Sequence, residues 1–188
     1  MKIILASSSL RRQQLMNKIT SEFEIVVSNF NEETVKFNGN SCEYVMELSE
    51  RKAREVSKVV EPDSIIIGAD TVVALDNIIL GKPKSREEAY NMLLSLSNRW
   101  HEVYTGVTII NNSSGRLESE CVATKVKFSK LTSHEISAYL DSADYMSFAG
   151  AYGIQGDAGI FVEQIKGDYY NIVGLPINRL NCMLKSFF

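Results

Sequence analysis

The chain has 188 residues, 45% of them hydrophobic and 23% charged, so it has the length of one domain and a composition that excludes global disorder. Twenty basic and 23 acidic residues give a net charge of −3. This balance argues against a protein whose main task is to grip a nucleic-acid backbone.

The first third of the chain predicts short strands that alternate with helices. The expected elements are a strand from Lys2 to Ser7, a helix over 9–19, a strand from Phe23 to Val27, a polar loop over 28–40 and a long helix from a Ser41 cap to about Val60. The apolar stripe of the long helix has Lys52 in its middle.

The middle of the chain predicts a hairpin and two long strands. Ser64 to Leu75 reads as a strand interrupted by Asp70-Thr71, and Asp76-Asn77 turns it back into 78–80. Two further strands are expected, over Val103–Asn111 and Leu117–Leu131.

Two capping boxes and a late glycine-rich stretch complete the pattern. Ser85 with Glu88, and Thr132 with Glu135, each predict the start of an amphipathic helix. A hairpin is expected around 166–168, followed by a last helix from Pro176. We find no linker or repeat, so the sequence predicts one mixed α/β (α+β) domain over residues 1–188.

The cysteines and the lack of a membrane segment point to the cytoplasm. Cys42, Cys121 and Cys182 are odd in number and far apart in sequence, which predicts reduced, buried thiols. No apolar run reaches 18 residues, and the apolar N-terminal stretch is too short for a signal peptide. We therefore expect a cytoplasmic protein without a membrane partner.

A phosphate cradle is one interpretation of the N-terminal turn. The chain contains neither a P-loop nor a Rossmann fingerprint. However, three serines (7–9) stand between a predicted strand and helix, and Arg11 and Arg12 follow them. Backbone N–H groups, hydroxyls and guanidinium groups there would bind phosphate. The alternative is a serine-capped helix with two solvated arginines.

Lys52 and Asp70 are each out of place in an apolar pattern. A lysine in an apolar stripe loses water unless it meets an anion, so Lys52 either extends past its neighbours to solvent or points at phosphate. In the second case, Lys52→Met would hold or raise stability. Asp70 interrupts an aliphatic strand, where a carboxylate is paired, metal-bound or catalytic unless it lies at a strand end or bulge. Glu32 or Glu33 could add a second carboxylate for Mg²⁺.

Several motifs, taken together, resemble the Maf family of nucleoside triphosphate pyrophosphatases over essentially the whole chain. They are Leu5-Ala6-Ser7-Ser8-Ser9-Leu10-Arg11-Arg12, Gly68-Ala69-Asp70-Thr71-Val72-Val73, Gly81-Lys82-Pro83, Tyr104-Thr105-Gly106-Val107, Ala149-Gly150-Ala151-Tyr152-Gly153-Ile154-Gln155-Gly156 and Val173-Gly174-Leu175-Pro176.

The resemblance implies a fold, an activity and a cofactor. The fold would be elongated and two-lobed with a central cleft, like that of the inosine-triphosphate pyrophosphatases. The activity would be hydrolysis of a nucleoside triphosphate to the monophosphate and pyrophosphate in the cytoplasm, with Mg²⁺ or Mn²⁺. Within the family the chain looks like the dTTP/UTP pyrophosphatase branch. Family members are often dimeric, which leaves a homodimer open. The alternative function is a non-catalytic, nucleotide-binding regulator of cell division.

The resemblance also implies roles for individual residues. Asp70 matches the proton acceptor and, with Glu32, the metal site, although the alignment leaves Glu33 open. The positions linked to substrate choice are Arg12, Thr71 and Gln155. The positions that would bind phosphate are Ser7, Ser9, Arg11, Lys52 and Lys82. On this scheme Asp70 accepts a proton from water as that water attacks the α-phosphorus.

The chain departs from the family pattern at two places. Leu10 stands where proline is usual, which removes a pre-set first helical turn. Ser147-Phe148 stands where the family commonly has Asp-Lys. If the missing aspartate binds metal or orients water, Asp144 or Asp157 would have to replace it.

Overall fold

The computed structural model describes residues 1–188 and contains one seven-stranded sheet in the order β2-β1-β3-β5-β6-β7, with β4 paired to β3. The strands are β1 (Lys2–Leu5), β2 (Glu24–Ile25), β3 (Ser64–Leu75), β4 (Ile78–Leu80), β5 (Trp100–Asn111), β6 (Leu117–Phe128) and β7 (Val162–Lys166). β1 pairs in parallel with β2 and β3, and the remaining pairs are antiparallel. The predicted mixed α/β class is confirmed.

Six α-helices and three short 3₁₀ turns surround the sheet. The helices are α1 (Leu10–Met16), α2 (Ser41–Ser57), α3 (Arg86–Leu96), α4 (Ser133–Ser142), α5 (Tyr169–Val173) and α6 (Ile177–Leu184). The 3₁₀ turns are η1 (Glu32–Thr34), η2 (Ala149–Ala151) and η3 (Asp157–Phe161). None of the helices is long and apolar enough to cross a bilayer.

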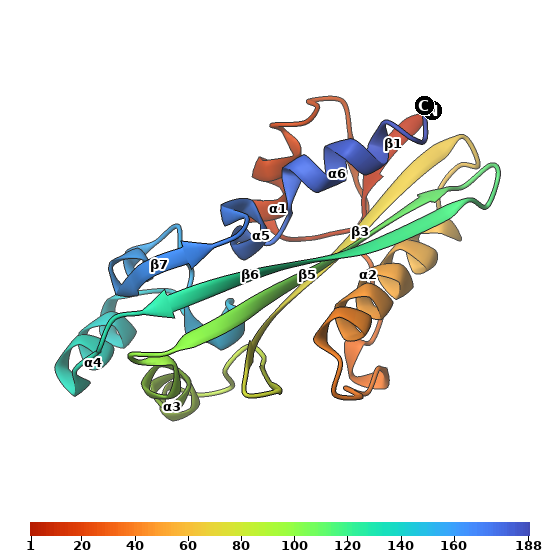
Figure 1. The fold of residues 1–188 in the computed structure, drawn as a ribbon. Coiled ribbons are helices and arrows are strands. Elements are labelled where there is room, and N and C mark those ends of the chain that lie inside the picture. Colours follow the sequence, from red (N-terminus) through yellow and green to blue (C-terminus); the bar gives the residue numbers. More distant parts are fainter.

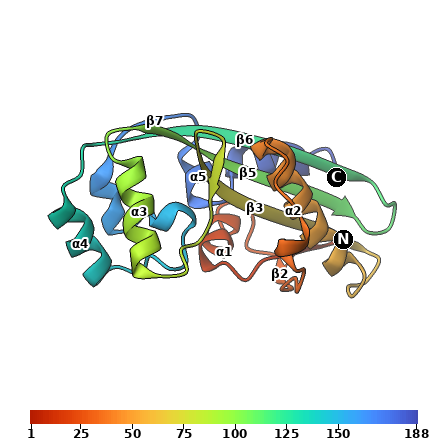
Figure 2. The ribbon, with the colours of Figure 1, turned by 90° about the horizontal axis from the view of Figure 1, so that it is seen from below.

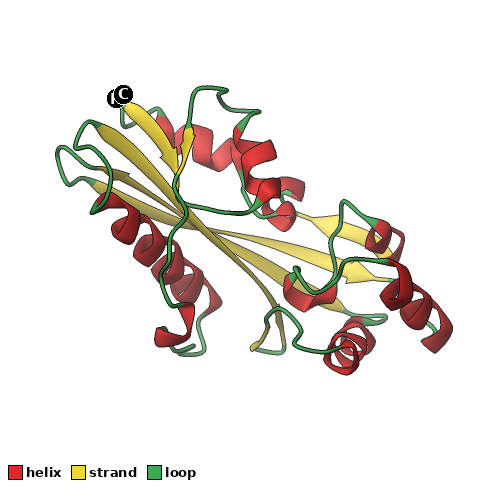
Figure 3. Cartoon of the chain, turned by 180° about the vertical axis from the view of Figure 1, so that it is seen from behind, coloured by secondary structure: helices red, strands yellow, loops and turns green.

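The long strands β3, β5 and β6 run through an elongated molecule and connect two lobes (Figure 1). In the first lobe, α2 covers one face of the sheet, and α1 and α6 lie on the other (Figures 1 and 3). In the second lobe, α3 and α4 lie side by side at the opposite end (Figure 2). Each lobe has its own core, because Ala69 of β3 packs in one apolar cluster and Val73 packs in the other.

Two glycines let α2 lie unusually close to the sheet. A Cβ atom on Gly106 would lie 2.2 Å from the carbonyl oxygen of Val45, and one on Gly68 would lie 2.2 Å from that of Ser49. Any larger residue would therefore push the helix away. This close packing brings the Lys52 side chain of α2 to Asp70 on β3.

Several predicted elements match the structure, and others need correction. β3, α3 and α4 lie where the apolar period and the caps place them, and the Thr132–Glu135 capping box is complete. The cap of α2 is Asn40 rather than Ser41. The hairpin predicted around 166–168 is wrong, because β7 pairs with β6 and Asp168 caps α5.

The prediction of three reduced, buried cysteines is also wrong. Cys42, in the first turn of α2, forms a disulfide with Cys121 of β6, which is 79 residues away in sequence. Cys182 is a free cysteine and is exposed. The pairing depends on α2 lying across the sheet, a tertiary arrangement that cysteine spacing does not reveal. Because disulfides are rare in a reducing cytoplasm, the cysteines no longer support the predicted compartment.

Candidate functional site

A cleft of about 450 Å³ lies between the two lobes. Its lining draws on both lobes, from α1 and α2 to the segment around η2. It includes every residue that the sequence predicts for the site, namely Ser7, Ser9, Arg11, Arg12, Glu32, Lys52, Asp70, Thr71, Lys82 and Gln155. The two of these ten that are farthest apart in sequence, Ser7 and Gln155, are separated by 148 positions and still share one cavity.

Asp70 lies where the two apolar cores meet on β3. It follows Ala69 of the first core, precedes Val73 of the second and pairs with Gly106 of β5. The residue is only 7% exposed, yet it lines the cleft. Asp70 therefore lies in mid-strand, and the strand-end alternative does not hold.

Lys52 connects the two carboxylates of the site. Its Nζ lies 2.5 Å from Asp70 Oδ1 and 2.7 Å from Glu32 Oε1. The Lys52 side chain is only 12% exposed, so it does not extend past its neighbours to solvent. It meets an anion, as one of the two interpretations of the sequence requires, but that anion is a pair of protein carboxylates.

Glu32, rather than Glu33, faces the cleft. Glu32 begins η1, pairs with Lys52 and lines the cleft, whereas Glu33 is not part of the lining. Burial raises the pKa of Glu32, but the hydrogen bond from Lys52 and the nearby positive charges more than offset this, so the pKa is lowered overall.

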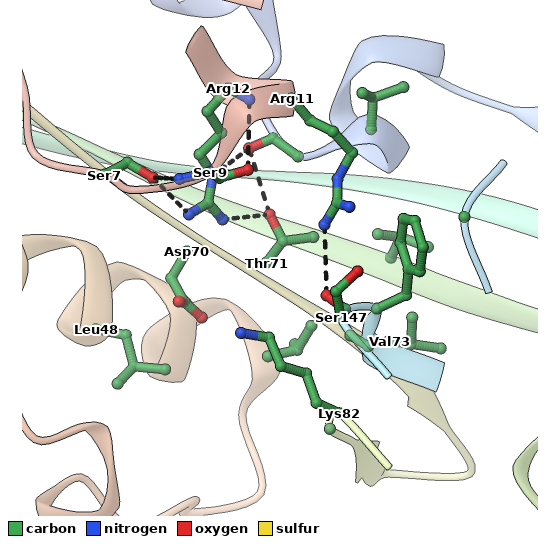
Figure 4. A pocket seen from close by; sticks show the side chains of 18 of the residues that line it. Ser7, Ser9, Arg11, Arg12, Leu48, Asp70, Thr71, Val73, Lys82 and Ser147 are labelled. Atoms are coloured by element: carbon green, nitrogen blue, oxygen red, sulfur yellow. Dashed lines mark hydrogen bonds between the residues drawn. The ribbon is translucent and has the colours of Figure 1, made fainter. Parts of the chain in front are cut away.

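Arg12 is held within the wall of the cleft. Its Nε donates to the carbonyl oxygen of Gly174 at 2.9 Å, and Nη2 donates to Thr71 Oγ1 at 3.1 Å (Figure 4). Burial lowers the pKa of Arg12, while the charge of Asp70 raises it. Thr71 Oγ1 also lies 2.9 Å from Thr105 Oγ1. Two of the three predicted specificity residues thus form a single hydrogen-bonded unit.

The other cations lie around the carboxylates. Lys82 extends toward Asp70, and Arg11 reaches the backbone of Ser147 across the cleft (Figure 4). Burial lowers the pKa of Arg11, and the charge of Asp144 raises it. Gln155, the third predicted specificity residue, is exposed in the lining, and its amide makes no hydrogen bond within the chain.

The two aspartates considered as substitutes for the family's acidic residue do not take that place. Neither Asp144 nor Asp157 belongs to the lining of the cleft. Asp144 instead accepts a hydrogen bond from the Ser147 hydroxyl at 3.3 Å. Asp70 and Glu32 are therefore the carboxylates that the cleft provides.

Sequence reasoning missed a buried polar group that anchors the wall of the cleft. Asn171 of α5 is fully buried and donates to the Val103 carbonyl oxygen and to Thr124 Oγ1, each at 3.0 Å. The backbone carbonyl oxygen of Asn171 accepts a hydrogen bond from the hydroxyl of Thr105, which in turn contacts Thr71. The Asp168 cap could have indicated the start of α5, but nothing in the pattern indicates these partners.

A buried histidine lies behind the second lobe's side of the cleft. His101 on β5 is 1% exposed, and its Nε2 lies 2.7 Å from the hydroxyl of Tyr152, which lines the cleft. Nδ1 has no hydrogen-bond partner. Burial lowers the pKa of His101 to about 4.

This histidine predicts a loss of stability in mild acid. Its pKa of about 4 in the folded chain lies below the value of about 6.5 in an unfolded chain. As the pH is lowered, the unfolded state therefore takes up the proton before the folded state does. The free energy of unfolding that is present above pH 6.5 falls by about 3 kcal/mol as the pH approaches 4. Denaturant unfolding of the wild type from pH 7.5 to 4.5 should show this loss.

His101→Gln should remove that part of the pH dependence, because glutamine does not titrate in this range. The matched control is His134→Gln at the exposed second histidine, which should retain the loss of stability in mild acid. Equal pH profiles for wild type and His101→Gln would contradict the prediction.

The fold is similar to that of solved structures of low sequence identity. A Ham1 protein from Staphylococcus aureus is 14% identical, with a TM-score of 0.55 and complete coverage of both chains. A nucleoside-triphosphatase, described as a dITP/XTP pyrophosphatase, from Mycobacterium abscessus is 16% identical, with a TM-score of 0.51 and coverage of 100% of this chain and 99% of that one. These likenesses establish the fold alone, and they agree with the expected two-lobed architecture.

Sequence relatives are much closer. A dTTP/UTP pyrophosphatase of Clostridium novyi (strain NT) is 51% identical over 180 residues, covering 96% of this chain and 94% of the relative. A dTTP/UTP pyrophosphatase of Clostridium botulinum (strain Kyoto / Type A2) is 53% identical over 186 residues, covering 98% and 96%. The family model described as Maf-like protein matches residues 2–187. From this nearly complete match and these relatives, the chain belongs to the family of Maf-like proteins.

Proposed function

We propose that the protein hydrolyses nucleoside triphosphates, with dTTP and UTP preferred, to the monophosphate and pyrophosphate. The observation that carries the proposal is the pair of carboxylates, Asp70 and Glu32, set among cationic side chains in one cleft. A triphosphate needs cations to offset its charge, and its hydrolysis needs a group that accepts a proton from water. Relatives that share about half of this sequence are named for this activity.

The residues present fit a divalent cation. Asp70 and Glu32 both lie within hydrogen-bond distance of a single Lys52 nitrogen, so both carboxylates can face one positive charge. Mg²⁺ is commonly held by one or two carboxylates together with water and substrate phosphates. A cation bound there would neutralise phosphate charge and lower the pKa of a coordinated water. We assign this cation, Mg²⁺ or Mn²⁺, to Asp70 and Glu32.

The remaining residues bind and orient the substrate. Arg11, Lys52 and Lys82 offset the charge of the triphosphate, and the hydroxyls of Ser7 and Ser9 add hydrogen-bond donors at the start of α1. Asp70 accepts the proton of the attacking water as the bond between the α-phosphorus and the bridging oxygen breaks. Pyrophosphate is the leaving group.

Base preference is assigned to Gln155 together with the Arg12–Thr71 unit. Uracil and thymine present an N–H flanked by carbonyl groups, which one amide can match with a donor and an acceptor. Because no hydrogen bond holds the Gln155 amide, it is free to rotate and to match cytosine as well. Gln155 alone therefore separates uracil from cytosine poorly, and the fixed Arg12–Thr71 unit has to supply the remaining discrimination.

Substrate preference tests the proposal directly. We expect dTTP and UTP to be hydrolysed at least several-fold better than CTP, ATP or GTP by kcat/KM, measured as pyrophosphate release with Mg²⁺ or Mn²⁺. A hydrogen-bonded pair is worth about 1–3 kcal/mol against the wrong base, or roughly 5- to 150-fold. Gln155→Ala should narrow the difference in kcat/KM between dTTP or UTP and the other three nucleotides.

The matched control is Gln164→Ala on β7, which removes an exposed glutamine that is not part of the cleft. Its kcat/KM values should equal those of the wild type. Equal rates for all nucleotides, or a preference for a purine, would contradict the base preference. The absence of pyrophosphate release would contradict the activity and favour the nucleotide-binding regulator.

We infer a cytoplasmic enzyme that acts on a free nucleotide, without a nucleic-acid or membrane partner, and we leave a homodimer open. We likewise infer that residues 1–188 act as one domain, since one sheet runs through both lobes.

A further inference from the structure

One contact that the predicted roles do not use spans the cleft. The guanidinium carbon of Arg11, on α1, lies 4.1 Å from the centroid of the Phe148 ring. Phe148 immediately precedes η2 in the segment that closes the cleft from the second lobe, and both residues line the cavity. At this distance the cation and the ring attract each other.

The stacking leaves the donors of Arg11 free. A guanidinium group presents its N–H bonds in its plane, so an aromatic ring on its face does not occupy them. Within the chain, Arg11 donates only one long hydrogen bond, from Nη2 to the Ser147 carbonyl oxygen at 3.5 Å. Arg12 differs, because its guanidinium donates to Gly174, Thr71 and Ser7. Arg11 is therefore the arginine with donors available to a ligand.

The Phe148 ring is itself held in place by a glycine. A Cβ atom on Gly153 would lie 2.3 Å from Phe148 Cε1 and 2.5 Å from Cζ. A ring atom in that position excludes any side chain at residue 153 unless the ring moves. Arg11 and Gly153 thus both pack against the ring, which limits its use as a platform for a nucleobase.

We propose that Phe148 is a positioning residue, whose ring holds the Arg11 guanidinium in the cleft so that its free N–H groups bind the phosphate chain of the substrate. This inference rests on the proposed function. It assigns Phe148 to recognition of the triphosphate rather than of the base. Any nucleotide with the same phosphate chain should be affected alike.

Inorganic tripolyphosphate is the probe, because it carries the phosphate chain without a base and reports binding without turnover. By calorimetric titration with Mg²⁺ present, Phe148→Leu should weaken tripolyphosphate binding by about 2- to 30-fold, the range of a cation–π contact. Phe148→Tyr keeps the ring and should bind as the wild type does. In kinetics with UTP, Phe148→Leu should raise KM by a similar factor and change kcat less than twofold.

A second variant moves the ring without changing either partner. Gly153→Ala introduces the Cβ atom that would meet the ring and should weaken tripolyphosphate binding as Phe148→Leu does. The matched control is Gly156→Ala, where the nearest atom to an added Cβ would be 3.7 Å away, and binding should not change.

A double-variant cycle decides whether the two residues act together. Arg11→Met should weaken tripolyphosphate binding, and adding Phe148→Leu to it should have little further effect. The inference would be overturned if the double variant lost affinity by the product of the two single losses. It would also be overturned if Phe148→Leu bound tripolyphosphate as the wild type does, or if the wild type did not bind it. Wild-type pyrophosphate release from UTP is measured separately. Its absence contradicts the proposed function, whereas loss of the coupling in an active enzyme contradicts only the role of Phe148.

Discussion

Replacing Asp70 by asparagine is expected to lower kcat for UTP by about 10²- to 10⁴-fold, the range for loss of a general base. Asparagine keeps the shape of the side chain but neither accepts the proton of water nor contributes a negative charge to a cation site. The protein should remain folded, because Lys52 keeps its ion pair with Glu32 and the asparagine carbonyl can still accept its hydrogen bond. Pyrophosphate release and thermal unfolding measure the two effects.

Asp76→Asn is the matched control for this variant. Asp76 lies just beyond the end of β3, where its carboxylate forms an exposed pair with Arg99. Its backbone has φ of 51°, in the left-handed region that asparagine tolerates. This control should keep wild-type activity. An Asp70→Asn enzyme that retained more than about a tenth of wild-type kcat would show that another group accepts the proton.

Lys52→Met is expected to damage both stability and activity. The sequence alone favours the opposite effect on stability, since a lysine in an apolar stripe is costly to bury. In the structure, however, Lys52 neutralises Asp70 and Glu32, and its removal leaves the nearly buried Asp70 without its partner. Breaking such a pair costs about 3 kcal/mol, which denaturant unfolding at pH 7 can measure.

A double variant that replaces both members of the ion pair provides the control. Removing Lys52 and Asp70 together, as Lys52→Met with Asp70→Asn, should recover much of the lost stability because no buried charge is left unpaired. Activity should not recover, since the proton acceptor is absent. If Lys52→Met alone were as stable as the wild type, the pair would contribute little and the buried-charge argument would fail.

The single variant Lys52→Met should also change the pKa of Glu32. The hydrogen bond and charge of Lys52 lower the pKa of this carboxyl against the effect of burial. Without Lys52 the effect of burial weighs more, so the pKa of Glu32 should rise. This direction can be followed by NMR titration of the side-chain carboxyl.

The chain's local patterns predicted most elements, because helix caps and apolar periods act over a few residues. β3 has the predicted bounds Ser64–Leu75, and α3 begins directly after its predicted cap, Ser85. The interrupted strand at Asp70 was equally visible, since a carboxylate among aliphatic residues is unfavourable unless it is used. The N-terminal serines and arginines, Lys52 and Glu32 were candidates on similar grounds. The resemblance to one family added Thr71, Lys82 and Gln155, and the structure places all of these residues in one cleft.

Partners across the fold could not be predicted in this way. The Cys42–Cys121 disulfide joins residues 79 positions apart, and its existence depends on α2 lying across the sheet. The prediction of a hairpin after β7 is wrong for a related reason. Gly167 and Asp168 suit either a hairpin or the start of a helix, and only the pairing of β7 with β6 decides between them. Local conformational preferences allow both outcomes, and tertiary packing selects one.

Lys52 shows most clearly what the sequence determined and what it left open. The apolar period of α2 places this lysine in the inward-facing stripe, where it either meets an anion or extends to solvent, because an unpaired charge in apolar surroundings is costly. Which anion it meets depends on the glycine-mediated approach of α2 to β3 and on the path of the loop that carries Glu32. Those are distances between segments far apart in the chain, and only the packing of the whole fold sets them.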